Sequence, residues 1–103
     1  MQQQAQGGRM IRPISFEQFK ADYLEKGFDE VMVRDWTPNQ EAPTHTHEFD
    51  ANALIVKGEM WLTVGQDTRH LMAGDTFELG HGTPHSEKYG PDGATFWVAR
   101  INH

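Results

Sequence analysis

Two histidines separated by a single residue constrain the fold of this chain most. His45 and His47 are followed closely by the apolar run Ala53-Leu54-Ile55-Val56. In a β-strand, alternate side chains point to the same face and the chain rises about 3.3 Å per residue, so the two α-carbons would stand about 7 Å apart on one side. Both rings could then converge on one ion. The pattern therefore favours a β-fold that carries a metal site.

A third histidine occurs further along the chain, in Gly80-His81-Gly82-Thr83-Pro84-His85. Two glycines and a proline favour a turn there, and the turn can bring His85 back to the first pair. Neutral imidazole binds divalent transition metals, and three protein ligands leave a coordination position open, as in catalytic rather than structural sites. His45, His47 and His85 are therefore the candidate metal ligands. A metal-free pocket lined by histidines is the competing interpretation.

The spacing around these histidines resembles the two motifs of the cupin superfamily, which are small β-barrels with a metal inside. The first motif, G-x5-H-x-H-x3-E-x6-G, is matched by His45, His47 and Gly58, while Asn39 or Gln40 stands in place of its first glycine.

The second motif, G-x5-P-x-G-x2-H-x3-N, is matched by Gly74, Gly82 and His85, with Gly80 in place of its proline and Tyr89 in place of its asparagine. Together the two motifs cover about residues 40 to 89. The resemblance implies an all-β barrel of the jelly-roll type and a homodimer.

One position departs from the family pattern, because Ala51 stands where cupins carry a metal-binding glutamate. Alternation along a strand would turn Glu48 and Asp50 away from the face of His47 and Ala51. The resemblance then implies a site of three neutral histidines, which is known in cysteine dioxygenases and acetylacetone dioxygenase. Three neutral ligands leave the charge of a divalent ion uncompensated, which strengthens its Lewis acidity.

The implied function is that of a metal-dependent enzyme, of the dioxygenase, isomerase or lyase type, acting on a small organic compound. Fe, Zn, Ni and Mn are the candidate metals. A non-catalytic sensor or binding module for a small ligand is the alternative, because fold alone does not separate the two. Residues that would do catalysis beyond the metal ligands are not identified by the sequence.

Composition excludes several other classes of protein. The chain has 103 residues, a net charge of −6 and no cysteine, so thiolate metal sites and disulfides are excluded. The nine basic residues are scattered, which argues against nucleic-acid binding. No apolar run approaches the roughly 20 residues of a membrane span, and no secretory signal is recognisable, so a cytoplasmic protein without a membrane partner is expected.

The chain is expected to comprise a disordered tail at 1–9 and one domain at 10–103. Ser15 is a good N-cap for a helix that Gly27 ends, and its apolar stripe is expected to seal the open edge or an end of the barrel. Short strands are then predicted, separated by turns at 65–67, 73–75 and 90–93. Their predicted ranges are 30–36, 51–57, 59–64, 68–71, 76–79, 85–89 and 94–101.

Three other histidines and several aromatic residues have less defined roles. His81 is expected to be an exposed loop residue, with a base beside the metal ligands or an alternative ligand as the other interpretations. His70 and His103 are expected to be incidental, because neither fits the motifs. Large aromatic side chains are expected mostly in the core, with one or two lining a pocket, and they are Trp36, Phe49, Trp61, Phe77 and Trp97.

Overall fold

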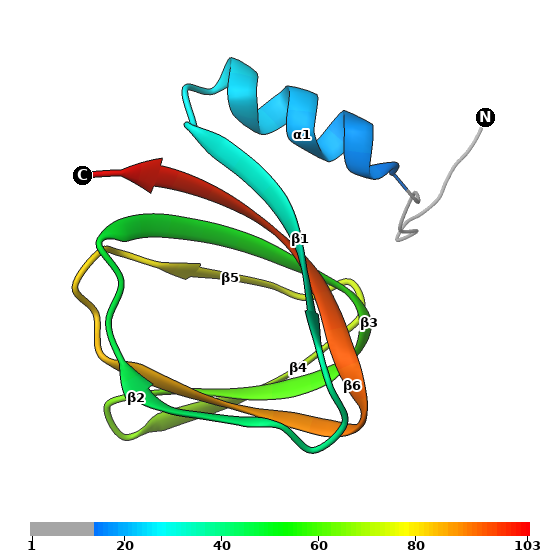
Figure 1. Ribbon diagram of the computed structural model, residues 1–103, viewed down its shortest axis with the longest axis vertical. Coiled ribbons are helices and arrows are strands. Elements are labelled where there is room, and N and C mark those ends of the chain that lie inside the picture. The colour runs from blue at the N-terminus through cyan, green and yellow to red at the C-terminus, as the bar shows by residue number, and fades with distance from the viewer. Residues whose placement is uncertain (1–13) are drawn as a thin grey trace.

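Two long antiparallel strands form the frame of the structure, a computed structural model that describes residues 14–103. They are β3 (Phe49–Val64) and β6 (His85–Asn102), and they pair with each other along most of their length. Both strands curve, so that each takes part in two walls of an open barrel (Figure 1). The tail expected at 1–9 lies outside the described residues.

Four shorter strands pair with the halves of this frame. β1 (Glu30–Trp36) and β2 (Glu41–His45) pair with β6, whereas β4 (Asp67–Met72) and β5 (Thr76–Leu79) pair with β3. All pairings are antiparallel. The predicted class, an all-β jelly-roll barrel with one helix, is thereby confirmed.

The bends of the two long strands occur at facing glycines. Gly58 pairs with Ala94 and Met60 pairs with Tyr89, so residues 90–93 of β6 bulge opposite one residue of β3. Gly58 and Gly93 both have positive φ angles, 77° and 72°, a region that glycine adopts without steric cost. The sequence prediction was wrong here in two respects: residues 90–93 form a bend within a strand rather than a turn, and 51–57 and 59–64 form one strand.

Strand β2 was not predicted, because it contains Pro43 and lacks apolar alternation. A proline removes a backbone donor and is tolerated at sheet edges. Among the described strands, β2 pairs only with β6, which agrees with that restriction.

The core lies between the two walls and is formed by alternate residues of the long strands, together with Leu71 of β4 and Phe77 and Leu79 of β5. Ile55 and Met60 are fully buried, and Val98 is 4% exposed. The same alternation places every second side chain of β1, β3 and β6 on the face towards the interior. The site described below lies at one end of this core.

Helix α1 (Phe16–Glu25) packs on the outside of the barrel. Phe16 and Phe19 each contact the ring of Trp97, with centroid distances of 5.6 Å. Trp97 lies on the outer face of β6, so the helix covers β6 and the edge strand β1 rather than an end of the barrel (Figure 1). No helix among residues 14–103 combines the length and the apolar character that a bilayer crossing needs.

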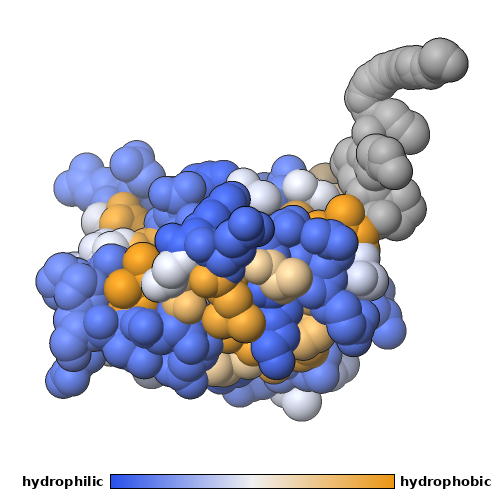
Figure 2. Space-filling view, turned by 90° about the horizontal axis from the view of Figure 1, so that it is seen from above, coloured by the Kyte–Doolittle hydropathy of each residue, from blue (hydrophilic) through white to orange (hydrophobic). Residues whose placement is uncertain are grey.

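The face that carries α1 is mainly hydrophilic, with hydrophobic side chains gathered near its middle (Figure 2). Four large hydrophobic residues of the described chain are exposed: Ile14, Leu24, Val33 and Met72.

Candidate metal centre

The three predicted ligands come together at one end of the barrel. Ring centroids are separated by 4.7 Å between His45 and His47, by 4.3 Å between His45 and His85, and by 5.0 Å between His47 and His85. His45 ends β2 and lies opposite His85, the first residue of β6. The interpretation of His45 and His47 as one strand is wrong in detail, because His47 lies in the connection to β3.

Backbone carbonyl groups fix the orientation of two rings. Nδ1 of His45 lies 2.7 Å from the carbonyl oxygen of Pro43, and Nδ1 of His85 lies 2.9 Å from that of Thr83. Because a carbonyl oxygen only accepts, each Nδ1 donates its hydrogen and Nε2 of the neutral ring keeps a lone pair. Metal-binding histidines are commonly oriented in this way.

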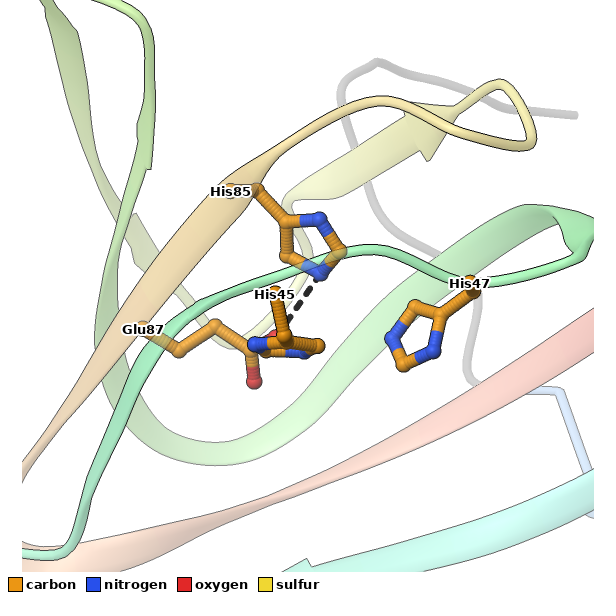
Figure 3. Close-up of side chains that lie close together, drawn as sticks. All are labelled: His45, His47, His85 and Glu87. Carbon is orange, nitrogen blue, oxygen red and sulfur yellow. Dashed lines mark ion pairs between the residues drawn. The ribbon is translucent and has the colours of Figure 1, made fainter.

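A carboxylate completes the cluster, and it comes from Glu87. Its Oε2 lies 3.2 Å from Nε2 of His85 and 3.6 Å from Nε2 of His45 (Figure 3). A tetrahedral ion with ligand bonds of about 2.1 Å needs donor atoms about 3.4 Å apart. One donor atom of each of the four residues lies within 4.8 Å of the others, so the spacing fits a single transition metal.

Electrostatics supports the same conclusion. Nε2 of His85 is buried and has no hydrogen-bond partner among residues 14–103. It faces a carboxylate oxygen, while the ring's other nitrogen donates elsewhere. A lone pair directed at a carboxylate is repelled unless a positive charge lies between them. Either a metal ion or a proton on Nε2 satisfies this arrangement, and the four-donor set favours the metal.

The surroundings of His47 favour the neutral form of its ring. Burial lowers this pKa from its ordinary value, and the charges of His45 and His85 lower it further. The neutral imidazole, which is the form that binds metals, is therefore favoured at neutral pH.

Glu87 is held in place by Tyr89 and Trp36. The buried Tyr89 hydroxyl donates to Oε1 of Glu87, and the Tyr89 ring stacks on Trp36 with centroids 4.8 Å apart. Burial and the charge of Glu87 raise the pKa of Tyr89, so its hydroxyl remains a donor. The other oxygen, Oε2, faces Nε2 of His85 and of His45.

The cluster opens into a small cavity of about 70 Å³. Its wall is mostly apolar, and Ala51 faces it, as the strand alternation predicted. Trp36, Phe49 and Phe77 also line it, whereas Trp61 stacks on His70 outside and Trp97 lies under the helix. The remaining lining residues are Arg34, Leu79, Phe96, Val98 and Arg100.

A second cluster, separate from this cavity, places two of the other three histidines, His81 and His103, near Asp50. Asp50 accepts hydrogen bonds from the backbone and ring of His81, at 2.8 and 3.1 Å, and from His103 at 3.0 Å. The His81 side chain is 56% exposed, as a loop residue was expected to be. Asp50 points away from the metal centre, in agreement with the predicted alternation.

Glu87 was missed by the sequence prediction, although a signal was present. A strand was predicted from His85 to Tyr89, and Glu87, two residues after His85, must share its face. Glu87 is on a different strand from Ala51, which stands at the family's glutamate position, so the motif alone does not indicate this carboxylate.

A family model of the cupin domain matches residues 32–95. No curated protein sequence matches the chain.

Three solved structures have a similar fold at low identity. KdgF from Halomonas sp. has a TM-score of 0.61 and 21% identity over 71% of this chain and 68% of that chain. The cupin domain of Schizosaccharomyces pombe Cnp3 has a TM-score of 0.65 and 18% identity over 74% and 61% of the two chains. A variant of oxalate decarboxylase from Bacillus subtilis, an enzyme with Mn(II) centres, has a TM-score of 0.64 and 19% identity over 70% and 20%.

These likenesses concern the fold alone, and the chain spans less than two thirds of the Cnp3 domain and a fifth of oxalate decarboxylase. The family model, however, covers more than half of the chain, including all four donors of the metal centre. The chain belongs to the cupin domain family.

Proposed function

We propose that this protein is a metal-dependent enzyme that acts on a small organic compound, with the metal held by His45, His47, His85 and Glu87. The observation that carries the proposal is the buried, unpartnered Nε2 of His85, which faces the carboxylate of Glu87. Such an ion supplies Lewis acidity, and Fe or Mn also supplies redox chemistry. Fe, Zn, Ni and Mn remain the candidates, and the Mn(II) centres of the oxalate decarboxylase neighbour support Mn.

The protein's own residues set the properties of this site. Glu87 compensates one unit of the ion's charge, so the Lewis acidity is lower than three histidines alone would give. Tyr89 holds the carboxylate, and the aromatic wall formed by Trp36, Phe49 and Phe77 limits the access of water.

The cavity offers few groups for acid–base chemistry besides the four donors. The only other titratable side chains among its described lining residues are Arg34 and Arg100, and arginine stays protonated. This favours chemistry that depends on the ion, of the dioxygenase, isomerase or lyase type. It equally fits the second candidate, a sensor that binds a ligand without turnover.

Metal analysis tests the first part of the proposal. Protein purified without chelators should carry about one transition metal per chain, and His85→Ala should lose it while keeping the far-ultraviolet circular dichroism of a folded barrel. Asp50→Asn is the matched control, because it alters the second cluster and should keep the metal. Full occupancy in His85→Ala would contradict the ligand set.

Activity assays separate the enzyme from the sensor. Fe(II)-loaded and Zn-loaded protein would be offered small β-dicarbonyl, hydroxy-acid and thiol compounds while oxygen uptake and products are followed. Turnover above that of His45→Ala supports an enzyme, whereas binding without turnover under both metals supports a sensor. The homodimer expected from the resemblance is a separate proposal, which sedimentation equilibrium tests.

A further inference from the structure

Two arginines project into the cavity that contains the metal centre. Arg34 lies on β1 opposite Phe96, and Arg100 lies on β6 opposite Ala51 of β3. Opposite residues of an antiparallel pair face the same side, and Phe96 and Ala51 both line the cavity. Both guanidinium groups therefore belong to its wall rather than to the outer surface.

Neither arginine has an acidic partner. No carboxylate oxygen of residues 14–103 lies within 4.0 Å of either guanidinium group. Glu30 pairs with Arg100 in register, but its carboxylate accepts a hydrogen bond of 3.0 Å from Asn102. Two positive charges thus face one cavity in a protein whose net charge is −6.

Aromatic rings hold both guanidinium groups in place. The group of Arg34 lies 4.9 Å from the Trp36 ring centroid, and that of Arg100 lies 4.0 Å from the Phe49 centroid. Stacking occupies the flat face of a guanidinium group and leaves the N–H groups at its edge free to donate. The side chains are therefore ordered before any ligand arrives, which reduces the entropy cost of binding.

Two buried hydrogen-bond donors indicate which kind of ligand the cavity would bind. Nε of Arg100 and Nε1 of Trp36 are both buried, and within the described part of the chain neither has a hydrogen-bond partner. Each of these nitrogens only donates, so a ligand that pairs with them must supply hydrogen-bond acceptors. Burial and, after it, the charge of Arg34 lower the pKa of Arg100, whereas the charge of Glu30 raises it. An anion bound near both guanidinium groups would offset the effect of Arg34.

We propose that Arg34 and Arg100 bind the carboxylate group of a small organic acid while its other end reaches the metal centre. This inference rests on the proposed function for the role of the metal, but the arginine pair is an independent structural feature. The cavity of about 70 Å³ has room for about five water-sized groups. That size selects acids of a few carbon atoms.

Isothermal titration with pyruvate, and with pyruvamide as its neutral counterpart, tests the inference. On the unmodified protein, pyruvate should bind at least tenfold more tightly than pyruvamide. Arg34→Gln and Arg100→Gln should each weaken pyruvate binding roughly ten- to hundredfold, as loss of a charged hydrogen bond does, without changing metal content. Arg69→Gln is the control: it makes the same change in charge, and its side chain donates to Thr76 outside the cavity.

Three results would overturn the inference: equal affinity for pyruvate and pyruvamide, unchanged pyruvate binding in both cavity variants, or an equal loss in Arg69→Gln. The comparison of acid and amide needs no variant, so it decides the matter even if a substitution prevents folding. Protein that carries no metal would contradict the proposed function. Its preference for pyruvate over pyruvamide would still support the arginine pair, and the lack of that preference would still contradict it.

Discussion

His85 and Glu87 place Nε2 and Oε2 3.2 Å apart on the same side of β6. Because side chains of a strand alternate, two residues with one between them can act as neighbouring ligands. The carboxylate of this candidate metal centre thus comes from the strand that carries the third histidine rather than from position 51.

Glu87→Gln should lower the affinity for Zn at least tenfold. The amide oxygen can still accept the Tyr89 hydroxyl hydrogen bond, so the side chain keeps its place while the negative charge is lost. Competition with a chromophoric chelator measures the affinity. An affinity equal to that of the parent protein would show that Glu87 does not bind the ion.

Ala51→Glu, introduced into the Glu87→Gln variant, should restore much of the lost affinity. Ala51 is 5% exposed and lines the cavity, so a carboxylate there projects towards the histidines. The same chelator competition measures the recovery. Asn52→Glu is the control, because the neighbouring residue faces the other side of β3. Equal recovery in that control would attribute the effect to net charge alone.

Ser15→Ala should lower the free energy of unfolding by about 1 kcal/mol. Ser15 Oγ accepts a hydrogen bond of 3.1 Å from the backbone N–H of Gln18 and so caps α1. Urea unfolding measures the loss, and metal content should not change. Gln18→Ala should cost less, because the Gln18 side chain bonds Asp22 and does not complete a capping box. Loss of metal from Ser15→Ala would instead link the helix to the site.

Asp50→Asn should destabilise the protein at neutral pH, and the deficit should shrink in acid. Hydrogen bonds from His103, followed by those from His81, lower the pKa of Asp50 well below its ordinary value of 3.8. The stability that Asp50 contributes is therefore full above that value and is lost as the pH falls towards the lower pKa of the folded state.

Urea midpoints of the parent and Asp50→Asn at pH 7 and pH 3 measure this effect. Asp92→Asn, at an exposed position, should show no such pH dependence. A deficit of Asp50→Asn that grows on acidification would contradict the prediction.

Local patterns in the sequence predicted the elements that depend on local chemistry. The Ser15 cap, the end of α1 at Gly27 and the bounds of β1 and β5 all agree with the structure. The bulge at 90–93 was not predictable in this way, because glycine, proline and aspartate signal a reversal as readily as a bend. Pairing with β3, a non-local interaction, decides between them.

The site residues likewise divide into those that local motifs predict and those that depend on non-local strand pairing. His45, His47 and His85 were predicted by motif spacing, and the structure brings them together. The arginines were not predicted, because both lie outside the two motifs and Arg34 reaches the cavity only through the pairing of β1 with β6. Which face of a strand points inward depends on the strands that pair with it. A single sequence does not identify those strands.

The facing glycines at the bend have a consequence for how the cavity can change in size. A β-carbon on Gly58 would lie 2.1 Å from the carbonyl oxygen of Gly93, and one on Gly93 would lie 2.3 Å from that of Trp36. β6 carries His85 before this bend and Arg100 after it. The bend therefore helps to set the distance between the candidate metal centre and the arginine pair. Adding or removing a residue at the bulge would change this distance, and with it the length of substrate that fits. Every side chain that lines the cavity would stay the same.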